Sequence, residues 1–421
     1  MTKKKIAIIG GGVAGLTSAY LLKDVCDIHL FEANNYFGGH ANTFVINSKS
    51  DKGLGIDTGF IVFNDRNYPL FNKLLNQLNV ESVASDMSFS YFCEKNALMY
   101  SSDIPSGIFA QKKQLLNPVY WRFLYEIHRF NTLAKKAIKN NKLKHLSLND
   151  FLDAHSFSKY FKLNYILPMG AAIWSSPVKD IASFLAEPFL HFFENHGLLQ
   201  IQNRPQWRTI KNGSQSYVKA ILKKISGKYS LSMPVKKIVR RSKEVDVVFN
   251  SGDVYKADKV IIATHADQAL KLLDKPSEIE KDLLGTWKYS KNHTYLHIDD
   301  QFMPSKKSAW ASWNVFNSRK HTANAPLCVT YFMNRLQKLN AEKNYFVTLN
   351  PISKISKRSI ISSMVYTHPL FTPESLETQI HLKKLNHQQN TYFCGSYFGY
   401  GFHEDAVRSA NYVASYFEAN L

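Results

Sequence analysis

The stretch Ile6-Ala7-Ile8-Ile9-Gly10-Gly11-Gly12-Val13-Ala14-Gly15 decides the fold of this chain. Its apolar half, residues 6–9, is typical of a strand that is buried on both faces of a sheet. Three glycines follow in G-x-G-x-x-G spacing, and residues 16–22 have the character of a helix. A second strand is predicted at residues 28–31 and ends at Glu32. A glycine motif between a strand and a helix predicts a doubly wound α/β domain.

The three glycines predict a site for a dinucleotide. Gly10 allows the tight turn, Gly12 lets a pyrophosphate approach the backbone at the helix N-terminus, and Gly15 lets helix and strand pack closely. Glu32 lies about 20 residues further on, where an acid accepts hydrogen bonds from the adenosine ribose. Val13, Ala14 and Ala33 complete the expected contacts at this end of the site.

Composition excludes several classes of protein. The chain has 421 residues, of which 45% are apolar, 20% charged and 13% aromatic, so it is too long for one compact domain and too apolar to be disordered. No run of 18 apolar residues is present, and the apolar stretch at residues 6–9 is too short for a signal peptide. The four cysteines form no CxxC pair, so neither a metal site nor a disulfide framework is indicated. We expect a cytoplasmic protein, with peripheral attachment to the inner face of the membrane as the alternative.

The net charge of +20 is the unusual feature of the composition. An excess of this size favours polyanions or anionic membrane surfaces as partners. The alternative explanation, of equal weight, is that the charge reflects a proteome rich in Lys and Asn. No nucleic-acid-binding motif accompanies the charge, so nucleic acid is not an expected partner.

A second glycine pair, Gly38-Gly39, distinguishes a flavin from a nicotinamide site. The chain here resembles flavoproteins in which a Glu-Ala pair leads into a Gly-Gly turn that brings the backbone back to the pyrophosphate. Those families usually have Arg after the pair, and this chain has His40. The resemblance implies FAD. No covalent attachment is expected, since Cys394 lies in a predicted buried strand and no other cysteine falls in a flavin-linking motif.

The order of predicted elements indicates two domains that interrupt each other in sequence. Strand, helix and strand are followed by a mainly helical stretch at 107–200, strands at 229–263 and 293–350, and a final strand and helix at 391–420. We predict an α/β fold with a discontinuous Rossmann-type FAD-binding domain (1–87, 201–290 and 386–421). An α+β substrate domain is inserted into it (88–200 and 291–385), and its first insert is mainly helical.

This arrangement resembles the flavin-dependent amine oxidase superfamily, which includes monoamine oxidases, protoporphyrinogen oxidases and phytoene desaturases. Pro234-Val235, the strand 259–264 and the segment 391–410 carry the resemblance. It implies that the Val235 backbone holds the adenine and that the C-terminal segment points a helix at the flavin. Members usually have Glu-Gly-Ala and Ser-Gly there, and both glycines are replaced in this chain. The cofactor residues that the resemblance implies are Gly59, Phe60, Val235, Ala263, Gly395, Ser396, Glu404, Asp405 and Ala406.

A narrower resemblance concerns one bacterial subgroup of predicted NAD/FAD-binding, amine-oxidase-like proteins. It rests on the segments 168–176, 195–199, 204–209, 310–314 and 398–404. Members are often encoded beside methyltransferases that resemble cyclopropane-fatty-acid synthases. This association implies lipid acyl chains as substrates.

The candidate catalytic residues are His196, His403 and Tyr400. A flavin takes the hydride itself, so protein acids and bases are few, and either histidine could abstract a proton during desaturation. The alternative for both is a hydrogen-bonded structural histidine. Many amine oxidases place a lysine near flavin N5, on a strand that corresponds here to residues 293–297. That strand has no lysine, so a dehydrogenase or desaturase is favoured over an oxygen-using oxidase.

Large rings and one arginine are the candidate substrate-binding residues. Trp174, Trp207, Trp310 and Trp313 are suited to line an apolar tunnel, or else belong to the ordinary core. Phe398 and Phe402 join Tyr400 as rings for an aromatic sandwich, or else as a packed cluster over the flavin. Arg208 is a candidate anchor for a carboxylate or phosphate, or one half of a structural ion pair.

Residues 111–145 form a basic amphipathic segment with nine Lys or Arg and one acid, Glu126. It either docks on an anionic bilayer or is a solvated helix packed on the substrate domain.

Three functions remain open from the sequence. The favoured one is an FAD-dependent dehydrogenase or desaturase that acts on an apolar, lipid-like substrate at the membrane surface. The alternatives are a soluble amine oxidase and a flavin-dependent isomerase or scaffold without net redox turnover.

Overall fold

The strand predicted from residues 6–9 is β1 (Lys5–Ile9), and it leads through the glycine turn into α1 (Val13–Leu22) and then β2 (Asp27–Phe31). The computed structural model describes residues 3–48, 50–140, 143, 145–200, 203–322 and 324–421. The apolar residues 6–8 of β1 are fully buried, as predicted for a central strand. The prediction of a strand, turn and helix is therefore confirmed.

Five parallel strands form the sheet around β1, in the order β10-β2-β1-β14-β20. The other three are β10 (Tyr229–Ser230), β14 (Lys259–Ile262) and β20 (Thr391–Phe393). Strands from both ends of the chain thus meet in one sheet. The predicted α/β, Rossmann-type fold with a second, inserted sheet is confirmed.

The two faces of the parallel sheet are covered differently. Ile6 and Ile8 pack with α1, α9 (Gln215–Lys224) and α14 (His403–Ser415) on one face. The opposite face packs on an antiparallel sheet of β11 (Val235–Arg240), β12 (Val245–Phe249) and β13 (Val254–Ala257). Phe31 joins the two, with its ring centroid 4.9 Å from Phe249 and 5.0 Å from Tyr255. Alternate residues of β1 therefore serve two different layers.

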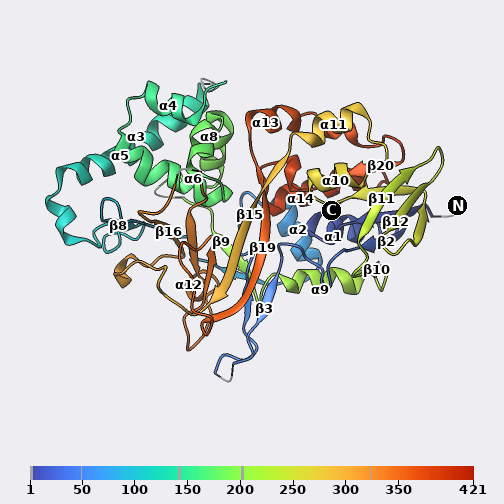
Figure 1. Ribbon diagram of the computed structural model, residues 1–421, viewed down its shortest axis with the longest axis horizontal. Coiled ribbons are helices and arrows are strands. Elements are labelled where there is room, and N and C mark those ends of the chain that lie inside the picture. The colour runs from blue at the N-terminus through green and yellow to red at the C-terminus, as the bar shows by residue number, and fades with distance from the viewer. Residues whose placement is uncertain (1–2, 49, 141–142, 144, 201–202, 323) are drawn as a thin grey trace.

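A seven-stranded sheet makes up much of the other half of the molecule, in the order β19-β15-β18-β17-β16-β7-β8. Its two longest strands, β15 (Lys288–His297) and β19 (Ile360–Leu370), pair along their full length and run between the two halves (Figure 1). The rest are β7 (Phe89–Cys93), β8 (Leu98–Ser101), β16 (Trp313–Asn317), β17 (Cys328–Phe332) and β18 (Phe346–Leu349).

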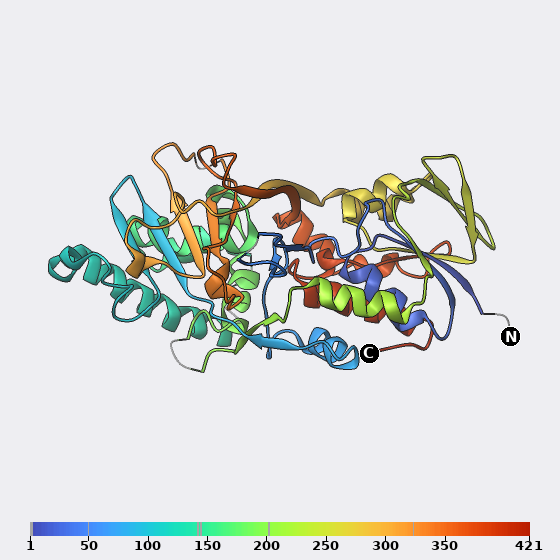
Figure 2. The same ribbon diagram turned by 90° about the horizontal axis from the view of Figure 1, so that it is seen from below.

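Helices predicted between residues 107 and 200 cover this second sheet. They are α3 (Pro118–Lys139), α4 (Leu148–Ala154), α5 (Lys159–Phe161), α6 (Leu167–Trp174), α7 (Val178–Ser183) and α8 (Ala186–Asn195). A 3-10 turn, η1 (Lys112–Leu116), precedes α3, and a π-helical turn, η2 (Lys162–Ile166), precedes α6. Figure 2 shows α3 lying along the outer end of this half, far from both chain termini.

Smaller elements complete the fold. They are β3 (Thr43–Val45), β4 (Gly55–Asp57), β5 (Phe63–Asn64), β6 (Ser82–Ala84), β9 (Trp207–Ile210), α2 (Pro69–Gln77), α10 (Ala266–Leu272), α11 (Glu278–Gly285), α12 (Met333–Leu336), α13 (Pro373–Gln379), η3 (Lys307–Ala309), η4 (Leu382–Leu385) and η5 (Ser396–Phe398). The last helix was expected to begin at about Asp405 and begins at His403, because the Asp405 carboxylate accepts the Phe402 amide and so caps the helix there. Within the described part of the chain, we find no helix with the length and apolarity to span a bilayer.

Candidate active site

The glycine turn after β1 leaves an open cradle at its middle glycine. A Cβ on Gly10, where φ is +105°, would lie 2.8 Å from the Ala263 carbonyl oxygen, and one on Gly15 would lie 1.9 Å from the Gly10 carbonyl oxygen. A Cβ on Gly12 would meet nothing within 4 Å. The outer glycines are therefore required by packing within the protein. Gly12 faces space, which fits the close approach of a phosphate to the backbone.

Glu32 is held at the edge of this cradle by the backbone. Its Oε2 accepts the amide of Gly11 at 2.6 Å, and its Oε1 accepts the amide and side-chain nitrogen of Asn34 at 2.9 and 2.7 Å. These bonds fix the orientation of the carboxylate and leave lone pairs for further donors. Such an arrangement suits the hydroxyls of an adenosine ribose.

The Gly38-Gly39 turn returns the chain to the same place. The Gly38 amide donates to the Gly11 carbonyl at 2.8 Å, and a Cβ on Gly39 would lie 3.4 Å from the Cα of Gly12. Both glycines have positive φ, +121° and +58°, which explains the residue type. His40 therefore follows immediately after the contact between the two glycine turns.

One cavity of about 910 Å³ begins at this cradle and continues between the two large sheets. Nearly all predicted cofactor residues line it: Gly10, Gly12, Val13, Ala14, Glu32, Ala33, Gly38, Gly39, His40, Gly59, Phe60, Val235, Ala263, Gly395, Ser396 and Ala406. Gly15 is absent from the lining because its role is in packing. The residues present thus fit an extended dinucleotide such as FAD. A bound FAD would accept a hydride from the substrate.

The two acids of the C-terminal segment do not line the cavity, which corrects the prediction that they contact the cofactor. The Glu404 carboxylate accepts the backbone amides of Leu70 and Phe71 at 3.1 and 2.9 Å, and so caps α2. The Asp405 carboxylate accepts the Phe402 amide at 3.0 Å and pairs with Arg408. Burial raises the pKa of both acids. Of the predicted Glu-Asp-Ala stretch, only Ala406 reaches the cavity.

Aromatic side chains wall the part of the cavity away from the glycines. The predicted Trp174, Trp207, Trp313 and Phe402 all line it, together with Phe192. Their rings come from different elements, and Phe192 of α8 stacks on Phe402 beside α14 at a centroid distance of 5.0 Å. No periodicity in the sequence could have brought these rings together.

Three other predicted substrate residues lie outside the cavity. The Arg208 guanidinium donates to the Ser82 hydroxyl and carbonyl at 2.8 Å each and is not part of the cavity lining, where an anchor for the substrate was expected. Phe398 packs against Tyr397 in the core, with ring centroids 4.9 Å apart. Trp310 donates from Nε1 to the Pro304 carbonyl at 2.8 Å, beyond the lining.

The predicted catalytic residues His196, His403 and Tyr400 all line the cavity. His196 stacks on Phe192 at 3.8 Å and places Nδ1 2.9 Å from the Phe192 carbonyl oxygen. A carbonyl only accepts, so Nδ1 carries the proton and Nε2 offers a lone pair. Burial lowers the pKa of His196 to about 4. His403 stacks on Phe60 at 3.5 Å, and burial together with His40 lowers its pKa well below the ordinary value.

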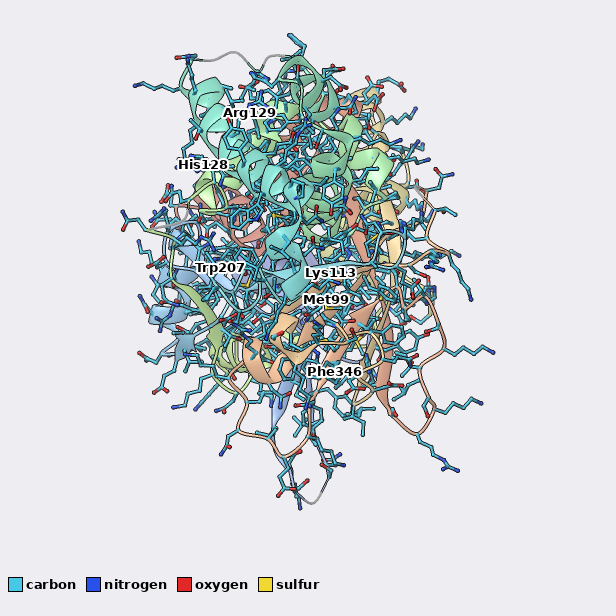
Figure 3. The ribbon with its side chains drawn as sticks, turned by 90° about the vertical axis from the view of Figure 1, so that its left-hand side faces the viewer. Met99, Lys113, His128, Arg129, Trp207 and Phe346 are labelled. Carbon is cyan, nitrogen blue, oxygen red and sulfur yellow. The ribbon has the colours of Figure 1, made fainter. Side chains whose placement is uncertain are left out.

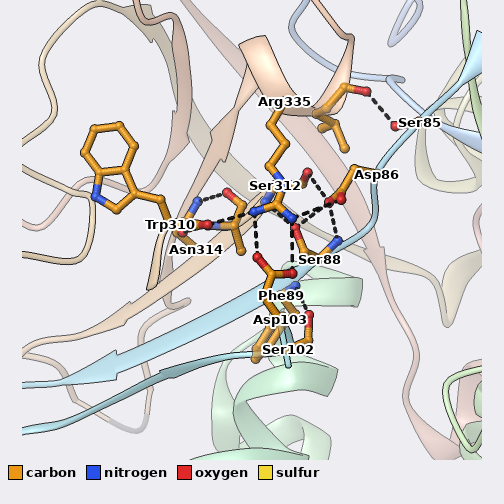
Figure 4. Close-up of polar contacts among 12 residues, drawn as sticks. Ser85, Asp86, Ser88, Phe89, Ser102, Asp103, Trp310, Ser312, Asn314 and Arg335 are labelled. Atoms are coloured by element: carbon orange, nitrogen blue, oxygen red, sulfur yellow. Dashed lines mark hydrogen bonds and ion pairs between the residues drawn. The ribbon is translucent and has the colours of Figure 1, made fainter. Parts of the chain in front are cut away.

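A charged cluster supports the wall segment Met87–Phe89 from behind (Figure 4). Arg335 of α12 donates to Asp86 at 3.0 Å and to Asp103 at 2.8 and 3.1 Å. Asp86 also accepts the amide of Ser88 at 2.8 Å and the hydroxyl of Ser312 at 2.9 Å. Burial opposes ionisation of Asp86, but the bonds from Ser88 and Arg335 outweigh it and hold its pKa below the ordinary value. Arg335 and the two carboxylates bond to one another, and Asp86 bonds to Ser88 of the wall segment, so the cluster positions the wall.

Lysines and cysteines are placed away from the aromatic part of the cavity. Strand β15 begins earlier than predicted and includes Lys288 and Lys291, but both side chains are exposed and neither lines the cavity. The four cysteines are buried, and none belongs to the lining.

Sequence reasoning missed a group of histidines that the structure brings together. His265 and His368 line the cavity beside His40, with ring centroids 6.2 and 5.2 Å from it. Tyr366 stacks on His40 at 4.9 Å. Tyr366 and His368 are neighbours on β19, but His40, His265 and this strand are more than 100 positions apart along the chain. The only signal in the sequence was the replacement of Arg by His40.

Comparison with known proteins agrees with this geometry. The family model for flavin-containing amine oxidoreductases matches residues 13–416. An L-amino-acid oxidase from Siganus canaliculatus is 24% identical over 300 residues, which cover 66% of this chain but only 53% of that relative. The match thus spans about half the length of that protein.

Solved structures share the fold at low sequence identity. Cyclohexylamine oxidase from Brevibacterium oxydans IH-35A aligns with a TM-score of 0.69 and 14% identity, covering 99% of this chain and 98% of that one. A CLA-producing fatty acid isomerase from P. acnes aligns with a TM-score of 0.66 and 12% identity, covering 98% of each chain. The family match and the glycine cradle identify the chain as a member of the flavin-containing amine oxidoreductase family, whose cofactor is FAD.

Proposed function

We propose that this protein dehydrogenates an apolar substrate, most simply a lipid acyl chain, by hydride transfer from a C–H bond to the flavin at a membrane surface. The observation that carries this proposal is the continuous cavity from the glycine cradle to the aromatic walls. A substrate that occupies the aromatic part would lie beside the cofactor. Dehydrogenation by a flavin requires such contact and little else from the protein.

The charge of the lining supports an apolar substrate. Among the described lining residues, Glu32 is the single acid, and Lys236 and Lys271 are the only permanently charged bases. Lys236 adjoins Val235 on β11, and Glu32 is held by the glycine turn, so these charges belong to the nucleotide end. An amino acid would need a cation for its carboxylate. The aromatic walls provide none.

His196 is the proposed proton acceptor. Its Nδ1 donates to the Phe192 carbonyl, so Nε2 of the neutral ring is the acceptor. Burial lowers the pKa of His196 to about 4, so the ring is neutral at pH 7 and Nε2 has a free lone pair, although it is a weaker base than an exposed histidine. Loss of a hydride and of a proton from adjacent carbons forms a double bond. His196 would take that proton while Phe192 fixes the ring.

The proposal includes reoxidation of the reduced flavin by an electron acceptor other than oxygen. The family feature associated with oxygen use is a lysine on the strand that corresponds to β15. Here Lys288 and Lys291 are exposed and outside the cavity lining. We therefore propose a dehydrogenase or desaturase.

Anaerobic titration of the holoenzyme tests substrate class. Fatty acyl lipids should bleach the flavin absorbance near 450 nm, whereas primary amines and amino acids of matched chain length should leave it unchanged. His196→Gln should slow bleaching by about 10²-fold or more, as expected for loss of a general base. Bleaching by amines alone would show a soluble amine oxidase instead.

A second candidate, a flavin-dependent isomerase, is favoured by the shared fold of the fatty acid isomerase. An isomerase returns the hydride to a different carbon, so the flavin shows no net reduction. Incubation with an unsaturated fatty acid, followed by mass spectrometry of the product, distinguishes the two. A moved double bond at unchanged mass indicates isomerisation, and a loss of two mass units indicates dehydrogenation.

Membrane attachment through the first insert is the final part of the proposal. Within residues 111–140, the one acid is Glu126, and its carboxylate is buried and accepts the Ser158 amide at 3.1 Å. The exposed permanent charges of α3 are thus all positive, and Lys135, Lys136 and Lys139 are among them. Figure 3 shows α3 across this end of the molecule, with His128 and Arg129 on it and Lys113 on the preceding turn η1.

Exposed apolar side chains adjoin these charges. We define the η1–α3 patch as Leu115, Leu116, Val119, Trp121 and Tyr125, of which Leu116 is 90% and Tyr125 64% exposed. Trp121 is held in place by donation from Nε1 to the Leu115 carbonyl at 2.9 Å. Apolar and aromatic groups beside lysines suit the headgroup region of an anionic bilayer. Arg129 contributes less than predicted, since it donates to the His155 carbonyl and lies over Phe157.

A further inference from the structure

Three imidazole rings lie near one another in the cavity, and one of them belongs to the residue that follows the second glycine turn. His40 follows the Gly39 turn, His265 follows β14, and His368 lies on β19. The ring of His40 lies 6.2 Å from that of His265 and 5.2 Å from that of His368, and all three line the cavity. We call these residues the histidine cluster. Within the described residues, no three His, Cys, Asp or Glu side chains are placed to hold a metal ion, so the cluster is not a metal site.

The buried part of the nucleotide site has no permanent positive charge. Lys236 and Lys271 are the only Lys or Arg among the described lining residues, and both side chains are largely in solvent. The pyrophosphate of a dinucleotide is a dianion at neutral pH. Backbone amides at the glycine turn stabilise it in part. The histidine cluster contains buried groups beside the second glycine turn that can gain a compensating charge.

A chain of hydrogen bonds determines which ring nitrogen of His368 carries the proton. The His293 amide can only donate, so the Asn350 atom 3.2 Å from it is Oδ1. Asn350 Nδ2 then donates to Asn292 Oδ1 at 2.7 Å, which leaves Asn292 Nδ2 to donate to His368 Nδ1 at 2.9 Å. His368 Nδ1 is therefore the acceptor, and its neutral ring carries the proton on Nε2.

His40 is the member of the cluster with an unused acceptor. The Thr367 backbone favours the protonated form of the ring and so raises its pKa, whereas Nε2 is buried and has no partner among the described residues. An unpaired buried lone pair is costly, and a proton there would remove the cost and add a charge. The two rings thus have different roles: His368 donates as it stands, and His40 gains a proton.

The surroundings keep the cluster neutral when no anion is present. Burial lowers the pKa of His40 to about 4, of His265 to about 4 and of His368 to about 3, and each ring also repels another of the three. The other titratable groups that face it are His403, Tyr366 and Tyr289. No carboxylate of the described residues contributes to these three shifts.

We propose that the histidine cluster is a protonatable anion site for the cofactor pyrophosphate, and that His40 takes up one proton from solvent when FAD binds. The proton adds to Nε2, and no bond breaks other than its bond to water or buffer. This inference rests on FAD as the cofactor and is independent of the proposed substrate. It makes affinity for FAD depend on pH in a range where FAD phosphates do not titrate.

Calorimetry on the full-length chain, stripped of FAD, tests the proposal. Titration with FAD at pH 6.5, in buffers of different ionisation enthalpy, should show uptake of close to one proton per FAD. The FAD dissociation constant should rise by about tenfold per pH unit between pH 6 and 7.5, because the logarithm of affinity changes with pH as the number of protons taken up. ADP-ribose, which contains the pyrophosphate, should show the same uptake, and riboflavin should show none.

Two substitutions separate charge from structure. His40→Arg supplies a permanent charge and should bind FAD without proton uptake and without pH dependence. His40→Gln should lose the uptake and bind at pH 6 about as weakly as wild type binds at pH 8. His29→Gln is the matched control, because burial lowers the pKa of His29 too but the residue lies outside the lining. Absence of uptake in wild type, or unchanged uptake in His40→Gln, overturns the proposal. Neither result bears on which substrate reduces the flavin.

Discussion

The carboxylate of Glu404, at the start of α14, accepts the backbone amide of Phe71, in the first turn of α2, at 2.9 Å. The bond, with a second one from Leu70, ties the C-terminal helix to a helix more than 300 positions earlier in the chain. Glu404 therefore replaces the missing side-chain cap of α2, because its N-cap residue, Tyr68, makes no such bond.

Loss of this cap should reduce stability without affecting the cofactor. We expect Glu404→Ala to lower the free energy of unfolding by about 1–2 kcal/mol, the usual effect of losing an N-cap. The ratio of FAD to protein should stay at the wild-type value. Thermal unfolding followed by circular dichroism, with flavin absorbance of the purified protein, measures both. A colourless but equally stable variant would show that Glu404 acts on the cofactor after all.

The open space at Gly12 allows a clean test of the cradle. Gly12→Val should fold, because its side chain starts in space, yet should abolish FAD binding by filling the position of the phosphate. Gly12→Ala should weaken binding to a smaller degree. Flavin content and circular dichroism of the two variants suffice. Full flavin content in Gly12→Val would contradict the placement of the pyrophosphate.

Asp57 should make stability depend on pH. It is fully buried, and burial raises its pKa to about 6 despite hydrogen bonds from Thr43 and Ser214. The folded state holds the Asp57 proton more tightly than the unfolded state does. The resulting stabilisation is fully present below pH 3.8, the pKa in the unfolded chain, and is lost as pH rises through about 6. Two units correspond to about 3 kcal/mol.

Comparison with Asp57→Asn isolates this effect from other acids. The variant does not titrate here, and its new amide group faces the Gln337 amide, which donates to Asp57 in wild type. It should be less stable than wild type at pH 4, and the difference should shrink by about 3 kcal/mol by pH 7. Urea unfolding at several pH values measures it. A constant difference would exclude the raised pKa.

Membrane attachment predicts a loss of vesicle binding on charge reversal. Replacing Lys135, Lys136 and Lys139 by Glu should weaken binding to anionic vesicles by at least about 100-fold, since each lysine contributes about 1 kcal/mol. FAD content should be unchanged. Turnover should fall on membrane-embedded substrate but persist on detergent-dispersed substrate.

A matched triple variant controls for net charge. Lys219, Lys223 and Lys224 lie exposed on α9, in the half that contains the parallel sheet, and their replacement by Glu should leave vesicle binding intact. Leu116→Ser with Trp121→Ser should weaken binding even at low salt, because the η1–α3 patch contributes apolar contacts. Equal binding by all variants would assign α3 a purely structural role.

The sequence alone predicted the elements whose structure depends on a local pattern of residues. The strand, turn and helix at residues 5–22 follow from apolar runs and glycine spacing, and so does the last strand at 391–393. Side-chain direction did not follow from pattern. Arg208 and Glu404 lie in the segments expected at the site, but β9 and α14 direct their polar groups to backbone amides and carbonyls elsewhere. The histidine cluster depends on tertiary contacts across the chain, which no local spacing records.

The parallel sheet has a consequence for how the protein matures. Its central strand β1 pairs with β14, and β14 pairs with β20, which ends at residue 393 of 421. During synthesis the last of these strands is still within the ribosome when most of the chain has emerged. The nucleotide cradle needs strands that lie far apart in the sequence, so the flavin can be held fully only once β20 has been made and has paired with β14.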